Sequence, residues 1–163
     1  IAKGYIADQV AALVRGRCSG ALLNFGGNVY AVGTKPDGSA YNVGVQDPDN
    51  PNSSNSIGFV SVTDRSVVTS GIYQRGFNID GVRYHHILSP WTGLPSDSDL
   101  ASATIIAESS MDADALATAC IVLGSEKALQ LTQENGYPAL MILRDGTVLM
   151  NDLMTQWGYT SLR

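Results

Sequence analysis

An acidic side chain and a hydroxyl stand one helical turn apart in an otherwise apolar segment. Asp114 and Thr118 are separated by four residues within 111–124, where the apolar pattern predicts a helix that is buried almost all round, so both lie on one face. A buried carboxylate is costly unless a cation or several donors face it, and a carboxylate with a hydroxyl suits a hard ion such as Mg²⁺. In the simpler interpretation, which spacing alone favours, Asp114 complements the helix dipole and Thr118 bonds to its own helix.

The two histidines of the chain are neighbours. His85 and His86 lie near the end of a strand predicted at 82–88, just before a loop at 89–99. Because neighbouring residues of a strand point to opposite faces, one imidazole can face a pocket while the other faces elsewhere. The alternative, one surface histidine and one hydrogen-bonded histidine, is better supported by the pair taken alone.

Three shorter features are compatible with an anionic ligand. Gly26 and Gly27 would allow a close backbone approach, although the pair taken alone favours a bulge or a turn. Lys3 opens a predicted helix near its positive end, where cations are disfavoured, and the hydroxyls of 69–70 could contact phosphate. No dinucleotide fingerprint, P-loop, serine elbow or paired-cysteine zinc motif is present in the sequence.

Composition narrows the class of protein. The 163 residues include 44% hydrophobic and 15% charged residues, with a net charge of −5 and no basic stripe, so neither nucleic acid nor an anionic membrane is expected as the main partner. No apolar run is long enough to span a membrane. Cys18 and Cys120 fit neither a zinc site nor a redox pair, and Cys120 is expected to be a buried free thiol.

The pattern of elements predicts an α+β fold with a mostly antiparallel sheet and packed helices. Helices are predicted at 2–15, where Ile6, Val10, Leu13 and Val14 recur at helical spacing, at 109–123 with Ser109 as N-cap, and at 125–135, with a short helical turn after 151. Strands are predicted at 21–25, 28–34, 40–45, 57–62, 66–70, 74–79, 82–88, 101–107, 139–143 and 147–150. Turn residues predict hairpins joining 28–34 to 40–45, 74–79 to 82–88, and 139–143 to 147–150, and 46–56 is expected to be an exposed loop.

Six short motifs, weak one by one, follow each other in an order that resembles the ApbE family of FAD:protein FMN transferases. They are Ala2-Lys-Gly-Tyr5, Asn24-Phe-Gly-Gly-Asn28, Val45-Gln-Asp-Pro48, Thr69-Ser-Gly71, His86-Ile-Leu-Ser-Pro-Trp-Thr-Gly-Leu-Pro95 and Asp114-Ala-Leu-Ala-Thr118. The resemblance extends from residue 1 to about residue 152. It implies a single ApbE-type domain over 1–163, and the start at Ile1 suggests that the N-terminal segment of the family is missing.

The resemblance also implies an activity. Family members bind FAD with Mg²⁺ on its diphosphate, a Ser or Thr hydroxyl of an acceptor flavoprotein attacks the FMN-side phosphorus, and AMP leaves. On matching positions, Asp114 and Thr118 would bind the metal, and Lys3, His85, Thr92 and Gly93 would contact FAD. His86 would activate the acceptor hydroxyl or steady the transferred phosphate.

One departure from the family pattern leaves alternatives open. The family sequence Asp-Pro-x-Thr-Gly is Ser89-Pro-Trp-Thr-Gly93 here, so an acidic side chain is lost. A pyrophosphatase that cleaves FAD to FMN and AMP, or a flavin-binding module without catalysis, would use the same scaffold. The resemblance further implies a location outside the cytoplasm, with membrane contact only through an anchor that lies outside the sequence.

Overall fold

A computed structural model describes residues 1–51 and 56–163. Residues 52–55, part of the loop expected at 46–56, lie outside the described residues. The helices are α1 (Ala2–Val14), α2 (Ser110–Leu123), α3 (Ser125–Glu134) and α4 (Asp152–Trp157). The strands are β1 (Gly20–Asn24), β2 (Asn28–Gly33), β3 (Tyr41–Gln46), β4 (Ser56–Val62), β5 (Arg65–Gly71), β6 (Gly76–Ile79), β7 (Val82–His85), β8 (Leu100–Ala107), β9 (Ala139–Leu143), β10 (Val148–Met150) and β11 (Tyr159–Ser161).

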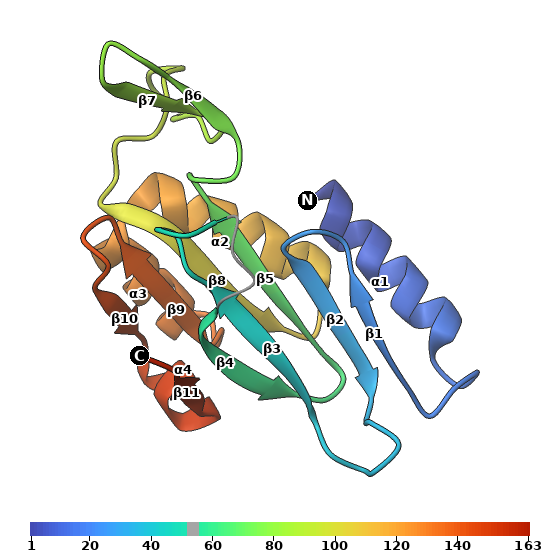
Figure 1. Ribbon diagram of the computed structural model, residues 1–163. Coiled ribbons are helices and arrows are strands. Elements are labelled where there is room, and N and C mark those ends of the chain that lie inside the picture. The colour runs from blue at the N-terminus through green and yellow to red at the C-terminus, as the bar shows by residue number, and fades with distance from the viewer. Residues whose placement is uncertain (52–55) are drawn as a thin grey trace.

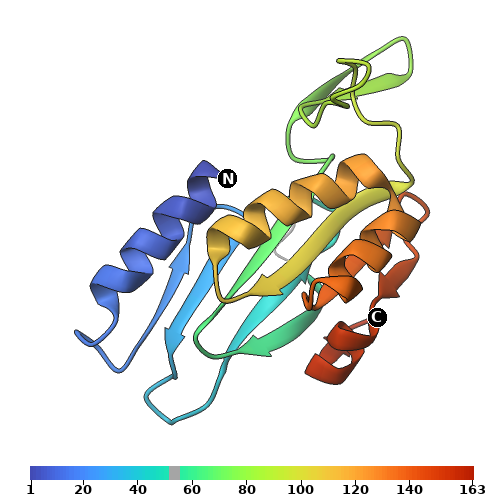
Figure 2. The same ribbon diagram turned by 180° about the vertical axis from the view of Figure 1, so that it is seen from behind.

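A six-stranded sheet, called here the main sheet, forms the centre of the molecule. Its strand order is β1-β2-β5-β8-β9-β10, and every neighbouring pair is antiparallel. The helices α1, α2 and α3 cover one face, and a three-stranded sheet of order β11-β4-β3 covers part of the other (Figures 1 and 2). The predicted α+β class with a mostly antiparallel sheet is therefore confirmed.

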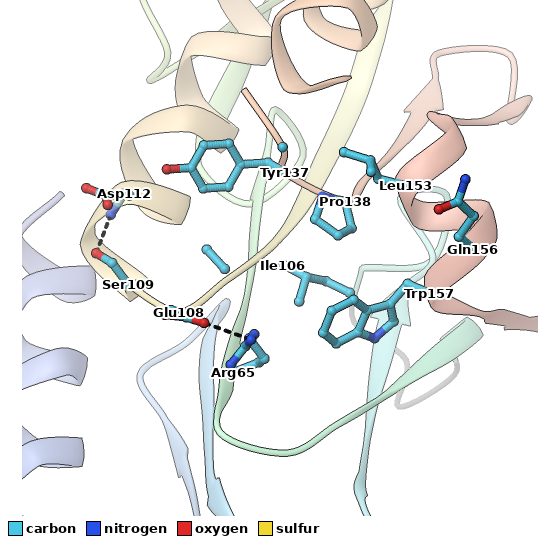
Figure 3. A pocket seen from close by; sticks show the side chains of 12 residues that line it. Arg65, Ile106, Glu108, Ser109, Asp112, Tyr137, Pro138, Leu153, Gln156 and Trp157 are labelled. Atoms are coloured by element: carbon cyan, nitrogen blue, oxygen red, sulfur yellow. Dashed lines mark hydrogen bonds and ion pairs between the residues drawn. The ribbon is translucent and has the colours of Figure 1, made fainter. Parts of the chain in front are cut away.

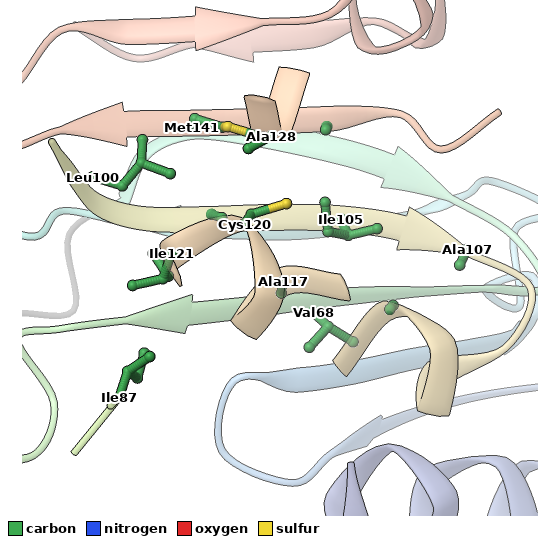
Figure 4. Packing of buried hydrophobic residues seen from close by; sticks show 13 residues of the cluster. Val68, Ile87, Leu100, Ile105, Ala107, Ala117, Cys120, Ile121, Ala128 and Met141 are labelled. Carbon is green, nitrogen blue, oxygen red and sulfur yellow. The ribbon is translucent and has the colours of Figure 1, made fainter. Parts of the chain in front are cut away.

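Hydrophobic clusters on both faces of the main sheet hold these layers together. Figure 4 shows the helix-side cluster, in which Val68 and Ile105 of the sheet pack against Ala117 and Ile121 of α2. The cluster on the other face joins the main sheet to the three-stranded sheet through Val43, Val45, Val60, Val67, Ile106 and Leu140. Successive residues of a strand face opposite sides of the sheet. Since both faces of the sheet are covered at β8, all eight residues of this strand are buried.

The helices α1 and α2 satisfy each other's N-terminal amides. Asp8 of α1 accepts hydrogen bonds from the amides of Ser110 (2.7 Å) and Met111 (2.9 Å) at the start of α2. In return, Asp114 of α2 accepts one from the amide of Gly4 (3.0 Å) in the first turn of α1. Free amides at a helix start need acceptors, and a carboxylate also complements the positive end of the dipole. The reciprocal capping fixes the start of α1 against the side of α2.

The β6–β7 hairpin and the segment that follows it form an arm. This arm projects beyond the ends of the central strands of the main sheet (Figure 1). The hairpin turns at Asp80 and Gly81, both of which have positive φ, as the Asp-Gly pair predicted. The rings of Phe77 and Tyr84 stack across it with centroids 5.6 Å apart. The predicted hairpins at 74–88 and 139–150 are confirmed.

The hairpin predicted for 28–45 is wrong. The turn around Pro36 forms, with the amide of Gly38 bonded to the carbonyl of Lys35. However, β2 pairs with β1 and β5 in the main sheet, while β3 pairs with β4 in the three-stranded sheet. The turn residues predicted a change of direction correctly, but they carry no information about which partner each strand finds.

The predicted faces of the first two helices are corrected as well. Small residues of α1, Gly4, Ala7 and Ala11, are buried, whereas Ile6 and Leu13 are exposed. The helix α2 is buried on one side, and Met111, Asp112 and Ala115 on its outer side are exposed, so it is not buried all round. Small side chains let the two helices approach closely, which an apolar count does not reveal. The strand β11, which pairs with β4, was also not predicted.

Among the described residues, no helix has the length and apolar character needed to cross a membrane.

Candidate functional site

The predicted site residues form two groups at the same end of the strands of the main sheet. The first group, Lys3, Asp114 and Thr118, lies where the start of α1 meets α2 and the β1–β2 turn. The second, His85, His86, Thr92 and Gly93, belongs to the arm, which leaves the sheet from the end of β5. Figures 1 and 2 show from both sides that the start of α1, the β1–β2 turn, the end of β5 and the arm all lie at this end of the main sheet.

Asp114 is a buried carboxylate on the face of α2 that meets α1. Its Oδ2 accepts the amide of Gly4 at 3.0 Å and lies 3.2 Å from the Ile1 nitrogen. Its Oδ1 has no hydrogen-bond partner among the described residues, and 9% of the side chain is exposed. The carboxylate therefore complements the dipole of α1, not that of its own helix, and keeps one oxygen available for a cation.

Thr118 lies one turn further along α2, at the exposed edge of the same face. Its hydroxyl donates to the carbonyl of Asp114 (3.1 Å), as the simpler interpretation predicted, and it also meets the hydroxyl of Ser70 at 3.1 Å. The donated proton leaves lone pairs of Oγ1 for another contact. Oxygen donors of this kind fit Mg²⁺, which keeps few protein ligands and takes the rest from water and phosphate.

No cluster of three or more His, Cys, Asp or Glu side chains capable of holding a metal occurs within the described residues. A metal at Asp114 and Thr118 would need further oxygen ligands, and a diphosphate can supply such ligands.

Lys3 reaches from α1 to the glycine turn between β1 and β2. Its ammonium donates to the carbonyl of Gly26 at 2.6 Å. The turn itself is closed by Asn24, whose side-chain oxygen accepts the amide of Gly26, and Gly26 and Gly27 both have positive φ. The turn thus holds the positive charge of a residue from the first turn of α1, the helix start whose Gly4 amide bonds to Asp114.

His85 is the buried member of the histidine pair. Its Nε2 lies 3.1 Å from the carbonyl oxygen of Ser96, which can only accept, so Nε2 carries the proton. Its Nδ1 is buried and has no partner among the described residues. Burial lowers the pKa of His85 below its ordinary value, so the ring is neutral in the folded protein at neutral pH.

His86 is exposed, so the two imidazoles face different environments, as strand geometry predicted. Its Nδ1 lies 3.3 Å from the carbonyl oxygen of Arg75, which again requires the proton on that nitrogen. In the neutral ring Nε2 is then the nitrogen without a proton, and this tautomer can accept a proton from a neighbouring hydroxyl.

Thr92 and Gly93 lie in an exposed tight turn that Ser89 closes. The amide of Gly93 bonds to the carbonyl of Ser89 (2.9 Å), and the hydroxyl of Ser89 accepts the amide of Trp91 at 3.4 Å. An aspartate at this position would accept the same amide. Gly93 and His86 line one shallow cavity of about 480 Å³. Ser89 therefore retains the turn-forming contact despite the lost charge.

A cavity of about 730 Å³ among the described residues is lined by none of the predicted site residues. It lies at the opposite end of the strands of the main sheet, where β8 ends and α2 begins (Figure 3). An ion pair between Arg65 and Glu108 (2.8 Å) crosses its wall, and Tyr137 and Trp157 line it. Size alone therefore does not identify the candidate site.

Three contacts of the site were not predicted from the sequence. They are the Gly4 amide on Asp114, the carbonyl of Gly26 on Lys3 and the Ser70 hydroxyl on Thr118. Each joins residues at least 23 positions apart, so no local pattern signals them. Ser70 was noted for its hydroxyl, but its partner was not.

Comparison with known proteins gives one consistent result. The model of the ApbE family matches residues 1–141. An FAD:protein FMN transferase of Treponema pallidum is 46% identical over 158 residues, covering 91% of this chain and 43% of that protein. One from Klebsiella pneumoniae is 37% identical over 153 residues, covering 93% of this chain and 46% of that protein. The chain thus spans less than half the length of these curated relatives.

Solved structures agree. The ApbE protein of Thermotoga maritima superposes with a TM-score of 0.87 at 34% identity, covering 96% of this chain and 51% of that one. The flavin transferase ApbE of Vibrio cholerae gives 0.81 at 31% identity, covering 96% of this chain and 50% of that one. The described fold is therefore shared by proteins of this kind.

Proposed function

This chain belongs to the ApbE family, and from that premise we propose that it takes part in Mg²⁺-dependent transfer of FMN from FAD to a Ser or Thr hydroxyl of an acceptor flavoprotein, with release of AMP. The names of its relatives support flavin transfer. The metal, the acceptor hydroxyl and the leaving group belong to the proposal.

The observation that carries the proposal is the meeting of α1 and α2 at Asp114. A buried carboxylate with one uncommitted oxygen accepts an amide at the start of α1, and Lys3 belongs to the same first turn. The Thr118 hydroxyl follows one turn further along α2. Helix starts and lysines bind phosphate, whereas a carboxylate there would repel it. A divalent cation between the carboxylate and a diphosphate reconciles the two.

In the proposed reaction, Asp114 and Thr118 would hold Mg²⁺ through Oδ1 and Oγ1. When bound, the cation neutralises charge on the diphosphate oxygens. Lys3 neutralises part of the remaining charge from the glycine turn. Phosphoryl transfer depends mainly on such positioning and charge compensation, and less on covalent help from the protein.

His86 is the proposed proton acceptor. The acceptor hydroxyl oxygen attacks the FMN-side phosphorus, its proton passes to Nε2 of His86, and the bond from that phosphorus to the AMP oxygen breaks. The carbonyl of Arg75 accepts from Nδ1–H, which orients the ring and leaves Nε2 as the proton-accepting nitrogen of the neutral form. The exposure of His86 is what a protein-sized acceptor requires, and it also admits water as a competing acceptor.

The proposal is tested by incubating the protein with FAD, Mg²⁺ and an acceptor flavoprotein that carries the target Ser or Thr. Covalently yellow acceptor together with one equivalent of AMP is the expected result. Free FMN and AMP without a labelled acceptor would identify a pyrophosphatase instead. Tight FAD binding without AMP release would identify a binding module and refute the catalytic proposal.

A further inference from the structure

The arm carries a group of exposed apolar side chains. Five large ones are more than half exposed, namely Phe77, Ile79, Leu88, Trp91 and Leu94. None of the five belongs to a hydrophobic cluster of the described residues, whereas Ile87 of the arm is buried in the helix-side cluster (Figure 4). Ile87 therefore anchors the arm, and the five exposed side chains are not part of the core. Apolar side chains gathered on a projecting segment mark a surface that another molecule covers.

The β6–β7 hairpin has one apolar and one polar face. Phe77 pairs with Tyr84 across the two strands and their rings stack, and Ile79 follows two positions later on the same face. On the opposite face Asn78 pairs with Arg83, whose guanidinium donates to two carbonyls just after β5, at the base of the arm. The polar face thus makes the contacts with the base of the arm, and Phe77 and Ile79 of the apolar face are exposed to solvent.

The apolar face continues to His86. The amide nitrogen and Nδ1 of His86 each lie 3.3 Å from the carbonyl oxygen of Arg75, which extends the pairing of the hairpin by one step. His86 lines the shallow cavity of about 480 Å³ together with Phe77, Leu88 and Leu94. Among the described residues of this lining, only Arg75 carries a permanent charge. The proposed proton acceptor therefore lies on a mainly apolar surface that is open to solvent.

The size and the place of this surface fit a transient protein partner. Stable interfaces between protein chains use about 20–30 residues on each side, and the exposed apolar side chains of the arm are far fewer. A permanent contact with a second copy of this chain would need more, whereas a substrate protein has to leave after each reaction. The arm projects beyond the sheet (Figure 1), where a folded protein can reach it. In the proposed reaction the acceptor flavoprotein has to bring its hydroxyl to His86, so it is the molecule that meets this surface.

We propose that the apolar face of the arm, formed by Phe77, Ile79, Leu88 and Leu94, docks the acceptor flavoprotein through apolar side chains that flank its target Ser or Thr. This assignment rests on the proposed function, because it takes a protein hydroxyl as the acceptor. It adds a partner-binding surface made of residues other than those proposed to hold Mg²⁺ and FAD. Water needs no such surface, so only transfer to the protein acceptor should depend on it.

The test compares Phe77→Ser and Leu88→Ser with the unmodified protein in the presence of FAD, Mg²⁺ and the acceptor flavoprotein. We expect each variant to raise KM for the acceptor about tenfold, as for the loss of one large apolar contact from an interface, while kcat at saturating acceptor changes by less than about twofold. FAD affinity and the slow release of AMP to water should be unchanged. Leu88→Ser leaves the stacked rings of the hairpin intact, so it separates lost docking from a distorted arm.

The matched control is Leu13→Ser, an exposed leucine near the end of α1, at the opposite end of the main sheet from the arm (Figure 1). This variant should leave KM for the acceptor, kcat and FAD affinity unchanged. Unchanged KM in both arm variants, with transfer intact in the unmodified protein, would overturn the inference alone. Failure of the unmodified protein to label the acceptor would overturn the proposed function and the inference together.

Two further measurements test the other molecules that an apolar face can bind. If the arm variants weakened FAD binding and left KM for the acceptor unchanged, the face would belong to the flavin and the inference would be wrong. Sedimentation of each protein alone and with vesicles of phosphatidylcholine and phosphatidylglycerol tests a second copy and a lipid surface. Self-association or vesicle binding that the variants abolish without a change in KM would likewise overturn the inference.

Discussion

Replacing Asp114 separates its structural task from its proposed metal-binding task. The side chain uses Oδ2 to accept the Gly4 amide and leaves Oδ1 uncommitted. Asp114→Asn keeps an oxygen for the amide and removes the charge that a cation needs. Asp114→Ala removes both.

The two substitutions should differ in stability and agree in activity. Losing a hydrogen bond to a charged group costs about 1.5–3 kcal/mol, and exchanging the carboxylate for an amide costs about 1 kcal/mol. For a chain of this size each kcal/mol lowers the melting temperature by about 2–4 °C. We therefore expect a fall of about 3–12 °C for Asp114→Ala and about 2–4 °C for Asp114→Asn.

The Mg²⁺ requirement is the decisive measurement. Loss of an outer contact to a metal ligand typically weakens a metal site about 10–100-fold, so loss of the ligand itself should raise the Mg²⁺ concentration for half-maximal AMP release by more than about 100-fold. AMP is quantified by chromatography across a Mg²⁺ titration, with melting curves measured in parallel.

Asp112→Asn, an exposed acid in the first turn of the same helix, is the matched control and should leave the Mg²⁺ titration unchanged. If Asp114→Asn kept the Mg²⁺ dependence of the unmodified protein, the metal assignment would be wrong and Asp114 would be a helix cap alone.

Three other results are expected. Gly4→Ala should destabilise the protein by about 1–3 kcal/mol in urea unfolding, because its Cβ would collide with the carbonyl of Ser110; a smaller loss than in the exposed-site variant Ala12→Gly would refute the close helix contact. Burial raises the pKa of Cys120 to about 12, so a thiol reagent at pH 8 should modify Cys18 and spare Cys120 until urea is added; two fast thiols in the folded protein would contradict this. The pKa of His85 is lowered on folding, so the unfolded chain binds protons first and the free energy of unfolding should decrease as pH falls below about 6.5, a slope that His85→Gln should flatten.

Local patterns predicted most elements because their signals lie within a few residues. Ser109 caps α2 by accepting the amide of Asp112 at 3.1 Å, and Gly124 ends it with positive φ, both as expected. The Asp80-Gly81 turn likewise encodes its own hairpin. The same logic failed at residues 35–38, because a tight turn does not determine which sheet the next strand joins.

The candidate site was only partly predictable, because its contacts are tertiary. The spacing of Asp114 and Thr118 placed both on one side of α2, but the partner of the carboxylate is an amide 110 positions away in sequence. The bond from Thr118 to its own helix was one of the two alternatives, and it does not exclude a metal, since the hydroxyl keeps lone pairs. The Mg²⁺ titration, and not the arrangement of the side chains, distinguishes a structural role of Asp114 and Thr118 from a metal-binding one.

The reciprocal capping of α1 and α2 explains how the desolvation cost of a buried carboxylate is offset at this site. Asp8 and Asp114 each satisfy the amides of the opposite helix, so neither carboxylate is desolvated without compensation. Two acids would suffice for packing if each used both oxygens on amides, as Asp8 does. Asp114 uses Oδ2 for an amide, and its Oδ1 has no hydrogen-bond partner among the described residues. Packing therefore does not account for Oδ1, whereas a bound cation would.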